Sequence, residues 1–438
     1  MQFDLKLTIF IITLFATQNV NAALSVATVN VIEGRPPLFV PQSIAQKLGF
    51  VVQGVHYSEA EGNINENTVK KFDKNLSLRD FVVTSLSPSD FTVEDNYFDE
   101  DGDEAHPLSP FTMDPIRYEW TDNQDRRITD LYLTLDCGSG LNLPLKLNIT
   151  LPNIQAHSQY GKPRESEPIT LTKSYRITTD SAICFAQPNQ MAVNHGNTWQ
   201  TFDGSSWQWN SYSSERDPVY GGGYNPDEFN PVYGFKYHVP VKFPTTGFPK
   251  AKFKLIMLHD NADYKFESEA TPSESVEVDA NGNVTLNSKP SAPVTIKATL
   301  KADTSVVYDY VFDPTTVWVV PQPNVYSLAN AVTKCGGLTN LPTRAELTNS
   351  PQITFPKNNQ SVPENSYTRA IGGGIFNEWG WADSGNYKNT YPGSFWVAGY
   401  YWTQDISVDN SYQFVVDADA GSVDSILLGG SVFLACRG

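Results

Sequence analysis

Residues 276–286 read VEVDANGNVTL, two short runs of alternating apolar and polar residues on either side of Asn281-Gly282. An Asn-Gly pair between such runs is a strong β-hairpin signal, because both residues tolerate the positive φ angles of a tight turn. Similar alternation occurs at residues 251–255 and 294–298. When apolar residues recur at every second position, their side chains lie on the same face of the strand, and that face can pack against a core. We therefore expect an antiparallel sheet in this part of the chain.

The same alternation recurs nearer the N-terminus, and long helical runs rich in Ala, Leu, Glu and Lys are missing. The 29 glycines and 29 prolines divide the 438 residues at short intervals, which favours many short strands joined by turns. Short helices are expected only at residues 42–49 and 327–335. The composition thus predicts a mainly-β protein. Further strands are expected at residues 81–83, 91–98, 116–120, 131–135, 145–151, 169–177, 308–312 and 317–320.

The first 22 residues are typical of a signal peptide. Lys6 precedes the apolar stretch 7–16, and Val20-Asn21-Ala22 offers a small-residue cleavage site. No later stretch approaches the roughly 20 apolar residues of a membrane helix. The net charge of −17 argues against nucleic acid or an anionic membrane as a direct partner. We therefore expect an exported chain without a membrane-spanning segment after cleavage.

Two sets of motifs carry a resemblance to known proteins. Tyr97-x-Asp99-x-Asp101-Gly-Asp103 with Tyr118-x-Trp120 resembles bacterial immunoglobulin-like repeats, and residues 241–320 resemble the last such domain of the invasin and intimin adhesins. The order of motifs after Pro321 is similar to the C-type-lectin-like tip of those adhesins, within the bacterial adhesion-domain family of enteric bacteria. Those motifs are Cys335-Gly-Gly, residues 341–347 (LPTRAEL), Glu378-Trp-Gly-Trp381, Tyr401-Trp-Thr403 and residues 435–438 (ACRG).

The resemblance implies immunoglobulin-like β-sandwiches followed by an α+β C-type-lectin-like domain. It also implies an adhesin that passes through the periplasm of a Gram-negative bacterium and is secreted or held at the cell surface. Its partner would be a protein or glycan receptor on another cell. The expected divisions are 1–22 signal peptide, 23–76 N-terminal segment, 77–190 immunoglobulin-like sandwich, 191–240 Trp- and Gly-rich linking region, 241–320 immunoglobulin-like domain and 321–438 C-type-lectin-like domain.

The chain has four cysteines, an even number that suggests two disulfides in an exported protein. Three pairings are formally open. Closeness in sequence favours Cys137 with Cys184 and Cys335 with Cys436. The lectin-like resemblance also implies the second pair, because a cysteine after the first helix is joined there to one on the last strand.

Aromatic residues are concentrated in the C-terminal region, where they suit either a binding surface or a core. We expect Trp381, Trp396 and Tyr400 to be exposed and to bind the ligand together with Asp405, and Trp379 and Trp402 to be core residues. True C-type lectins bind sugars through calcium with Glu-Pro-Asn and Trp-Asn-Asp motifs. The nearest strings here, residues 362–365 (VPEN) and 402–405 (WTQD), do not supply that set. Ligand binding without calcium is therefore expected at this end.

Residues 90–104 contain eight acidic and no basic residues. Asp99, Asp101 and Asp103 resemble half of a calcium loop, because this hard cation prefers several carboxylate oxygens. A complete EF-hand would need acids where Tyr97 and Leu108 stand. Calcium at these three aspartates is one hypothesis, a solvated acidic turn is the other, and no other cofactor is expected.

Motifs of the common hydrolases are absent from the sequence, which contains neither HExxH nor GxSxG. The triple glycines at 221–223 and 372–374 lack the Lys-Ser/Thr of a phosphate loop. Residues 341–347 echo the formylglycine-generating enzymes of the same fold family, but the two nearby cysteines suit a structural bridge. We therefore expect a protein that is not an enzyme. A secreted hydrolase or oxidase and a structural subunit of a surface assembly are the alternatives.

Overall fold

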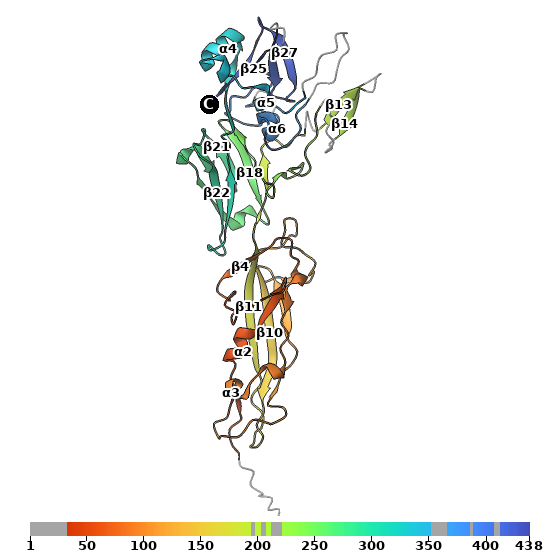
Figure 1. Cartoon of the computed structure of the whole chain (residues 1–438), viewed down its shortest axis with the longest axis vertical. Helices are drawn as coiled ribbons and strands as arrows, with labels where there is room; N and C mark the ends of the chain where they lie inside the picture. Colours follow the sequence, from red (N-terminus) through yellow and green to blue (C-terminus); the bar gives the residue numbers. More distant parts are fainter. Residues whose placement is uncertain are drawn as a thin grey trace, which may run out of the picture. The chain divides into compact units, whose positions relative to one another are not determined.

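The computed structural model describes residues 33–193, 198–202, 207–211, 221–351, 366–385, 389–406 and 412–438. Most of the regular secondary structure in the described residues is β-strand, as predicted (Figure 1). They form two compact units, the first made of residues 33–46, 85–117 and 150–172, and the second of residues 47–84, 118–149 and 173 onward. The predicted signal peptide lies outside the described residues.

The first unit is built around three phenylalanines. The rings of Phe39, Phe91 and Phe111 meet edge to face, with centroids 5.3 to 5.7 Å apart. Two short antiparallel pairs surround them, β1 with β6 and β7 with the end of β10. The elements are β1 (Leu38–Phe39), α2 (Gln42–Lys47), α3 (Val93–Asn96), β6 (Tyr97–Phe98), β7 (Phe111–Thr112) and β10 (Leu145–Ala156), together with a 3-10 turn at Pro88–Asp90.

The predicted strand at residues 91–98 is wrong for most of its length. The hydroxyl of Thr92 accepts a hydrogen bond from the N–H of Asp95 at 3.3 Å and caps the single helical turn α3. Such capping competes with extended structure at Ser, Thr, Asp and Asn. Only the last two residues of the predicted strand pair as a strand.

The second unit begins with two sheets. The larger has the order β4-β11-β10-β8-β9, and the smaller the order β3-β2-β5. Three of these strands come from the predicted N-terminal segment 23–76, which therefore contributes to the sheets rather than standing apart. The strands are β2 (Gly49–Val52), β3 (Val55–Ser58), β4 (Val69–Phe72), β5 (Val82–Val83), β8 (Arg117–Thr121), β9 (Arg127–Ile128) and β11 (Ile169–Thr179).

The predicted strand at residues 131–135 is also wrong. Its carbonyls at Leu131 and Leu133 accept N–H groups of Arg79 and Leu78, at 3.0 and 3.1 Å. The neighbouring chain does not continue as a strand, because residues Leu78–Asp80 turn into a 3-10 helix capped by Ser77. The alternating sequence therefore has only a single bridge, between Ser77 and Thr134, and no ladder.

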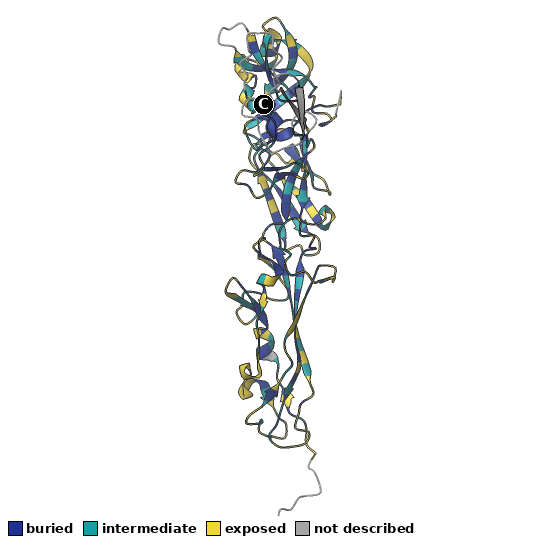
Figure 2. Cartoon of the chain, turned by 90° about the vertical axis from the view of Figure 1, so that its right-hand side faces the viewer, coloured by how far each residue is buried: buried dark blue, intermediate teal, exposed yellow. Residues whose placement is uncertain are grey.

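The next part of the second unit contains two further sheets, with the orders β15-β16-β12-β18-β21-β20 and β19-β22-β23. Burial alternates residue by residue along β18 and β22, as the sequence predicts, and buried residues gather along the strands (Figure 2). The bounds are β12 (Ile183–Pro188), β15 (Phe229–Asn230), β16 (Gly234–Lys236), β18 (Ala251–Met257), β19 (Tyr264–Glu269), β20 (Val276–Val278), β21 (Asn283–Leu286), β22 (Val294–Leu300) and β23 (Val307–Phe312).

The hairpin predicted at Asn281-Gly282 is present. Val278 pairs with Val284, and the N–H of Asp279 donates to the carbonyl of Asn283 at 3.0 Å. Gly282 has a φ of 77°, which a residue with a side chain would adopt only under strain. The turn thus fixes the register of β20 and β21.

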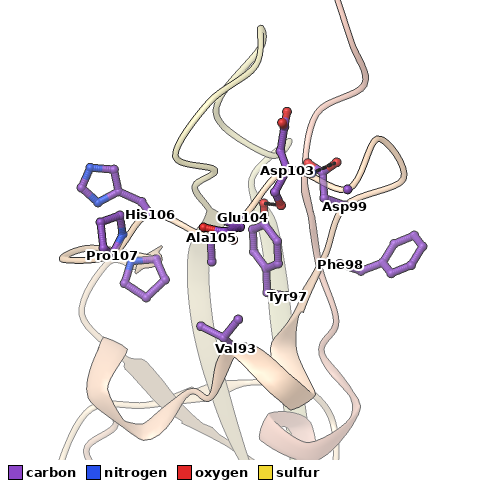
Figure 3. A pocket seen from close by; sticks show the side chains of 11 residues that line it. Val93, Tyr97, Phe98, Asp99, Asp103, Glu104, Ala105, His106 and Pro107 are labelled. Atoms are coloured by element: carbon purple, nitrogen blue, oxygen red, sulfur yellow. Dashed lines mark hydrogen bonds between the residues drawn. The ribbon is translucent and has the colours of Figure 1, made fainter.

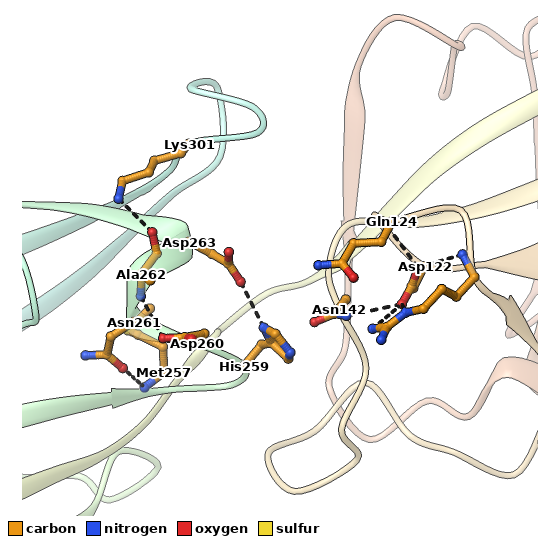
Figure 4. Close-up of polar contacts among 11 residues, drawn as sticks. Asp122, Gln124, Asn142, Met257, His259, Asp260, Asn261, Ala262, Asp263 and Lys301 are labelled. Atoms are coloured by element: carbon orange, nitrogen blue, oxygen red, sulfur yellow. Dashed lines mark hydrogen bonds and ion pairs between the residues drawn. The ribbon is translucent and has the colours of Figure 1, made fainter.

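Polar side chains also fix two other turns of the second unit (Figure 4). Asp260 accepts the N–H of Ala262 at 2.9 Å, and His259 lies 2.8 Å from the carboxylate of Asp263. In the turn between β8 and β9, buried Asp122 accepts the side chain of Arg126 at 2.8 Å. Hydrogen bonds to the ionised form lower the pKa of Asp122, although burial opposes them.

The predicted boundaries at 190 and 240 do not follow the strand pairing. Strand β12 ends at Pro188 but pairs with β16 and β18, and so belongs to the sheet that follows it. Strands β15 and β16 come from the predicted linking region and join the same sheet. The remaining described strands of that region are the hairpin β13 (Thr198–Phe202) and β14 (Trp207–Ser211). Alternation identifies strands but not their partners, because partners are chosen by tertiary packing.

The C-terminal part of the second unit is a sheet with three short helices. Its strand order is β17-β24-β28-β25-β26-β27, and β24 crosses the boundary predicted near Pro321. Buried Trp402, Val415 and Leu434 form its core with Ala331 of α4. The elements are β17 (Thr246–Gly247), β24 (Val317–Ser327), α4 (Leu328–Cys335), α5 (Arg344–Leu347), α6 (Ile375–Trp379), β25 (Tyr400–Ile406), β26 (Tyr412–Asp417), β27 (Val423–Leu427) and β28 (Ser431–Arg437).

Helix α4 begins where the sequence predicts it. The hydroxyl of Ser327 accepts the N–H of Asn330, and Gly336 ends the helix in a left-handed conformation. Across the described ranges, none of the helices combines the length and the apolar character needed to cross a membrane.

Candidate functional site

Trp381 and Trp396 are core residues, which corrects the expectation that they are exposed. Their exposed fractions are 3% and 0%. The ring of Trp396 packs against Tyr401, Phe376 and Phe248, with centroids 4.6, 5.1 and 5.7 Å away. Trp381 and Trp396 therefore form part of the interior of the C-terminal region. Trp379 and Trp402 are buried as predicted.

Tyr400 and Asp405, the other two residues of the predicted ligand site, lie on β25. Tyr400 is half-buried and packs against the core around Trp402. A carboxylate oxygen of Asp405 accepts the backbone N–H of Arg344 at 2.6 Å and lies 3.6 Å from Nε of the same arginine. Asp405 therefore positions the arginine at the start of α5.

A partly apolar surface lies beside this ion pair. Tyr412 and Leu427 stand directly opposite each other on β26 and β27, and are 40% and 61% exposed. Paired residues on antiparallel strands share one face of the sheet, and Phe414 is two residues along on the same face. The guanidinium of Arg344 lies 4.2 Å from the ring centre of Phe414. We call Arg344, Asp405, Tyr412, Phe414 and Leu427 the β26–β27 surface.

Of these five residues, sequence reasoning found only Asp405. Strand β27 is the last strand of its sheet in the described part of the chain, and it is labelled in Figure 1. Its end carries Leu427-Leu428 before Gly429-Gly430, two leucines directly ahead of a turn, and both are exposed. That pair of leucines is the sequence feature from which an exposed apolar surface could have been predicted.

The buried side chain of Glu378 contacts β17, at the end of the C-terminal sheet opposite to β27. Glu378 is fully buried, and its carboxylate accepts hydrogen bonds from the backbone N–H groups of Thr245, Thr246 and Gly372 at 2.8 to 3.1 Å. Burial raises the pKa of Glu378, and the hydrogen bonds oppose that shift. The arrangement holds β17 to α6 and exposes no acid or base to a substrate.

Arg369 is fully buried next to this carboxylate. Its guanidinium donates to the carbonyls of Gln190 at 3.0 Å and Ala192 at 3.2 Å, and to the carbonyl of Glu378 at 3.0 Å. It also lies over the ring of Phe229 at 4.7 Å. These contacts join the loop after β12 to the C-terminal region.

The acidic run surrounds a cavity of about 510 Å³ in the first unit (Figure 3). Asp99 accepts the N–H groups of Asp101 and Asp103 at 2.9 and 3.2 Å, and Asp101 accepts the N–H of Arg35. Burial, followed by the charges of Asp99 and Asp103, raises the pKa of Tyr97 to about 12. No three His, Cys, Asp or Glu side chains among the described residues are grouped as metal ligands. The hypothesis of calcium at the three aspartates therefore gains no support.

Both predicted disulfides are present. Cys137 is bonded to Cys184, and Cys335 at the end of α4 is bonded to Cys436 on β28. The second bridge closes the C-terminal region next to the core around Trp402.

The comparisons with known proteins agree with this architecture. Residues 228–312 match the family model described as invasin, domain 4. The invasin of Yersinia enterocolitica is 28% identical over 181 residues, which are 41% of this chain and 19% of that protein. The chain thus spans about a fifth of the length of that curated relative.

Comparison with solved structures gives three matches of low TM-score. A bacterial integrin-binding invasin gives a TM-score of 0.43 at 17% identity, over 90% of this chain and 59% of its own. A mutant intimin of EHEC O157:H7 and an intimin–Tir90 complex give TM-scores of 0.31 and 0.32 at 20% identity, each over 48% of this chain and 92% of their own. Residues 228–312 are thus similar to domain 4 of invasin, and 41% of the chain is similar in sequence to the invasin of Yersinia enterocolitica.

Proposed function

We propose that this protein is an exported adhesin that binds a protein receptor on a host-cell surface through the β26–β27 surface. The observation that carries the proposal is the exposed pair of Tyr412 and Leu427 beside Arg344 and Phe414. Tyrosine and arginine are enriched among the residues that dominate binding energy, and exposed apolar side chains next to them add area that binding can bury.

The relatives support a protein rather than a glycan as the receptor. The solved invasin is described as integrin-binding, and one intimin structure contains Tir90. Those partners belong to those proteins, and what carries over to this chain is the class of partner. The β26–β27 surface suits that class, because it presents exposed Tyr412 and Leu427 next to Arg344.

The experiment compares binding of the purified chain and two variants to cultured host cells. Leu427→Asp places a charge at the exposed centre of the surface, and Tyr412→Ala removes the aromatic ring. We expect each to weaken binding at least tenfold, since central interface residues commonly contribute about 2 kcal/mol or more. Circular dichroism and thermal unfolding would verify that both variants fold.

Val311→Asp is the matched control, because Val311 is 49% exposed on β23 of a different sheet. It introduces the same charge outside the β26–β27 surface and should leave binding unchanged. If Leu427→Asp binds cells as tightly as the unchanged chain, the surface is not the docking site. If the unchanged chain binds no host cells, the adhesin proposal itself fails.

A further inference from the structure

A second cavity, of about 230 Å³, lies in the first unit, and every side chain that lines it is polar. It is separate from the β26–β27 surface, which belongs to the second unit. Pockets for drug-sized ligands range from about 300 to 1,000 Å³ and have mostly apolar walls. A smaller cavity lined by polar residue types suits a small ligand that can form hydrogen bonds. The lining includes His106, Ser109, Thr112, His157, Arg164 and Glu165.

The two histidines are held by the backbone and by fixed partners. The N–H of His106 donates to the carbonyl of His157 at 2.8 Å, which brings the two segments side by side. Nδ1 of His106 accepts the N–H of Ser109 at 3.1 Å. In a neutral imidazole the proton must then be on Nε2, so that atom is a hydrogen-bond donor. Nε2 of His157 lies 2.8 Å from the hydroxyl of Thr112.

The lining of the cavity contains one positively charged side chain, Arg164, and one negatively charged side chain, Glu165. Within the described part of the chain, the guanidinium of Arg164 makes no hydrogen bond or ion pair, although it lines the cavity. A guanidinium presents a planar set of donors that matches a carboxylate with two parallel hydrogen bonds. The carboxylate of Glu165 lies 3.9 Å from Nδ1 of His157 and is largely exposed, so it can accept hydrogen bonds from hydroxyl groups.

We propose that this cavity binds the terminal acidic sugar of a glycan, a single pyranose ring that bears a carboxylate. The carboxylate pairs with Arg164 and with the Nε2–H of His106. The ring hydroxyls donate to Glu165 and exchange hydrogen bonds with Ser109. A neutral sugar would leave the guanidinium without an anionic partner, and an apolar side chain would make none of the hydrogen bonds that the lining groups offer.

The net charge of −17 opposes an anionic ligand at long range. At physiological salt this repulsion is screened beyond about 8 Å, whereas contacts inside the cavity are much less affected. Binding should therefore be measured at that ionic strength. The expected affinity is low for one sugar ring, so ligand-observed NMR titration of the full chain is the suitable method.

The probes are glucuronic, galacturonic and N-acetylneuraminic acid, with methyl glucoside as the neutral ring and acetate as the carboxylate alone. We expect at least one acidic sugar to bind at least tenfold more tightly than both methyl glucoside and acetate. Arg164→Gln should abolish that difference. Arg117→Gln, which removes another exposed arginine of the same unit, should preserve it.

Several outcomes would overturn the proposal: no acidic sugar binding, acetate or methyl glucoside binding equally well, or Arg164→Gln binding like the unchanged chain. This test is independent of the adhesin proposal, because none of these residues belongs to the β26–β27 surface. Leu427→Asp should leave sugar binding intact, and loss of sugar binding without loss of cell binding would leave the proposed function standing.

Discussion

Thr246 donates two hydrogen bonds to the same carboxylate oxygen of Glu378, from its backbone N–H at 2.9 Å and from its hydroxyl at 2.7 Å. The two residues are 132 positions apart, on β17 and α6. The indole N–H of Trp379 donates to the carbonyl of Thr246 at 3.1 Å and fixes the same contact from the neighbouring residue. A buried carboxylate with this many donors makes the junction specific, since an amide or hydroxyl side chain in its place would bring a donor of its own.

This junction should make stability depend on pH. Burial raises the pKa of Glu378 in the folded state, so the folded chain binds this proton more tightly than the unfolded chain. The resulting stabilisation is complete below the ordinary pKa of glutamate and is lost as pH rises through the raised value. We expect the advantage in unfolding free energy of the unchanged chain over Glu378→Gln to shrink across that window. Urea unfolding at a series of pH values measures it.

Glu378→Gln also replaces one acceptor oxygen by a donor, which should cost about 1 to 3 kcal/mol at every pH because a buried N–H then lacks a partner. Glu346→Gln is a useful control, because Glu346 pairs with Arg437 nearer the surface of the same region. An advantage over Glu378→Gln that stays constant from pH 4 to pH 8 would show that Glu378 remains ionised despite its burial.

Local pattern predicted the strands whose partners lie close in sequence. The hairpin of β20 and β21, the alternation of β18 and β22, and the cap of α4 at Ser327 all depend on residues within a few positions of one another. The two disulfides also followed from the number and spacing of the cysteines.

Burial of the aromatic residues could not be predicted in the same way. Whether Trp396 is exposed depends on Phe248, 148 positions earlier, and nothing near Trp396 specifies that contact. The β26–β27 surface likewise depends on strand register, which places Tyr412 opposite Leu427. Residues 183–188 were placed in the predicted division 77–190, but as β12 they pair with β16 and β18, which come later in the chain.

Trp396→Ala should therefore act on stability rather than on binding alone. Removing a fully buried tryptophan side chain costs about 3 to 5 kcal/mol, through lost burial and the cavity that remains. Tyr412→Ala, on the exposed side of β26, should cost much less. Chemical unfolding of both variants makes the comparison. A Trp396→Ala variant as stable as the unchanged chain would contradict the burial of this ring.

Removal of calcium should have no effect on the first unit. One carboxylate oxygen of Asp99, Oδ1, accepts two N–H groups of its own loop, and Asp101 accepts the N–H of Arg35. We expect the thermal transition of the full chain to be the same in excess chelator and in millimolar calcium. A rise in melting temperature with calcium that disappears in Asp99→Asn would restore the metal hypothesis.

Loss of the Cys335–Cys436 bridge should destabilise the C-terminal sheet selectively. The bridge joins positions 101 residues apart, and in the chain-entropy model closing such a loop contributes up to about 5 kcal/mol. That is a large share of the roughly 5 to 15 kcal/mol that stabilises a typical domain. The double variant Cys335→Ser, Cys436→Ser should therefore lose amide-exchange protection in β25 and β28 first, while β22 stays protected.

Removal of the Cys137–Cys184 bridge is the matched control, since it spans 47 residues and contributes about 4 kcal/mol in the same model. It joins the chain after residues 131–135 to β12, so its loss should expose the first sheets of the second unit and spare β25 and β28. Equal loss of protection in both regions from either double variant would mean that the second unit unfolds as one cooperative block.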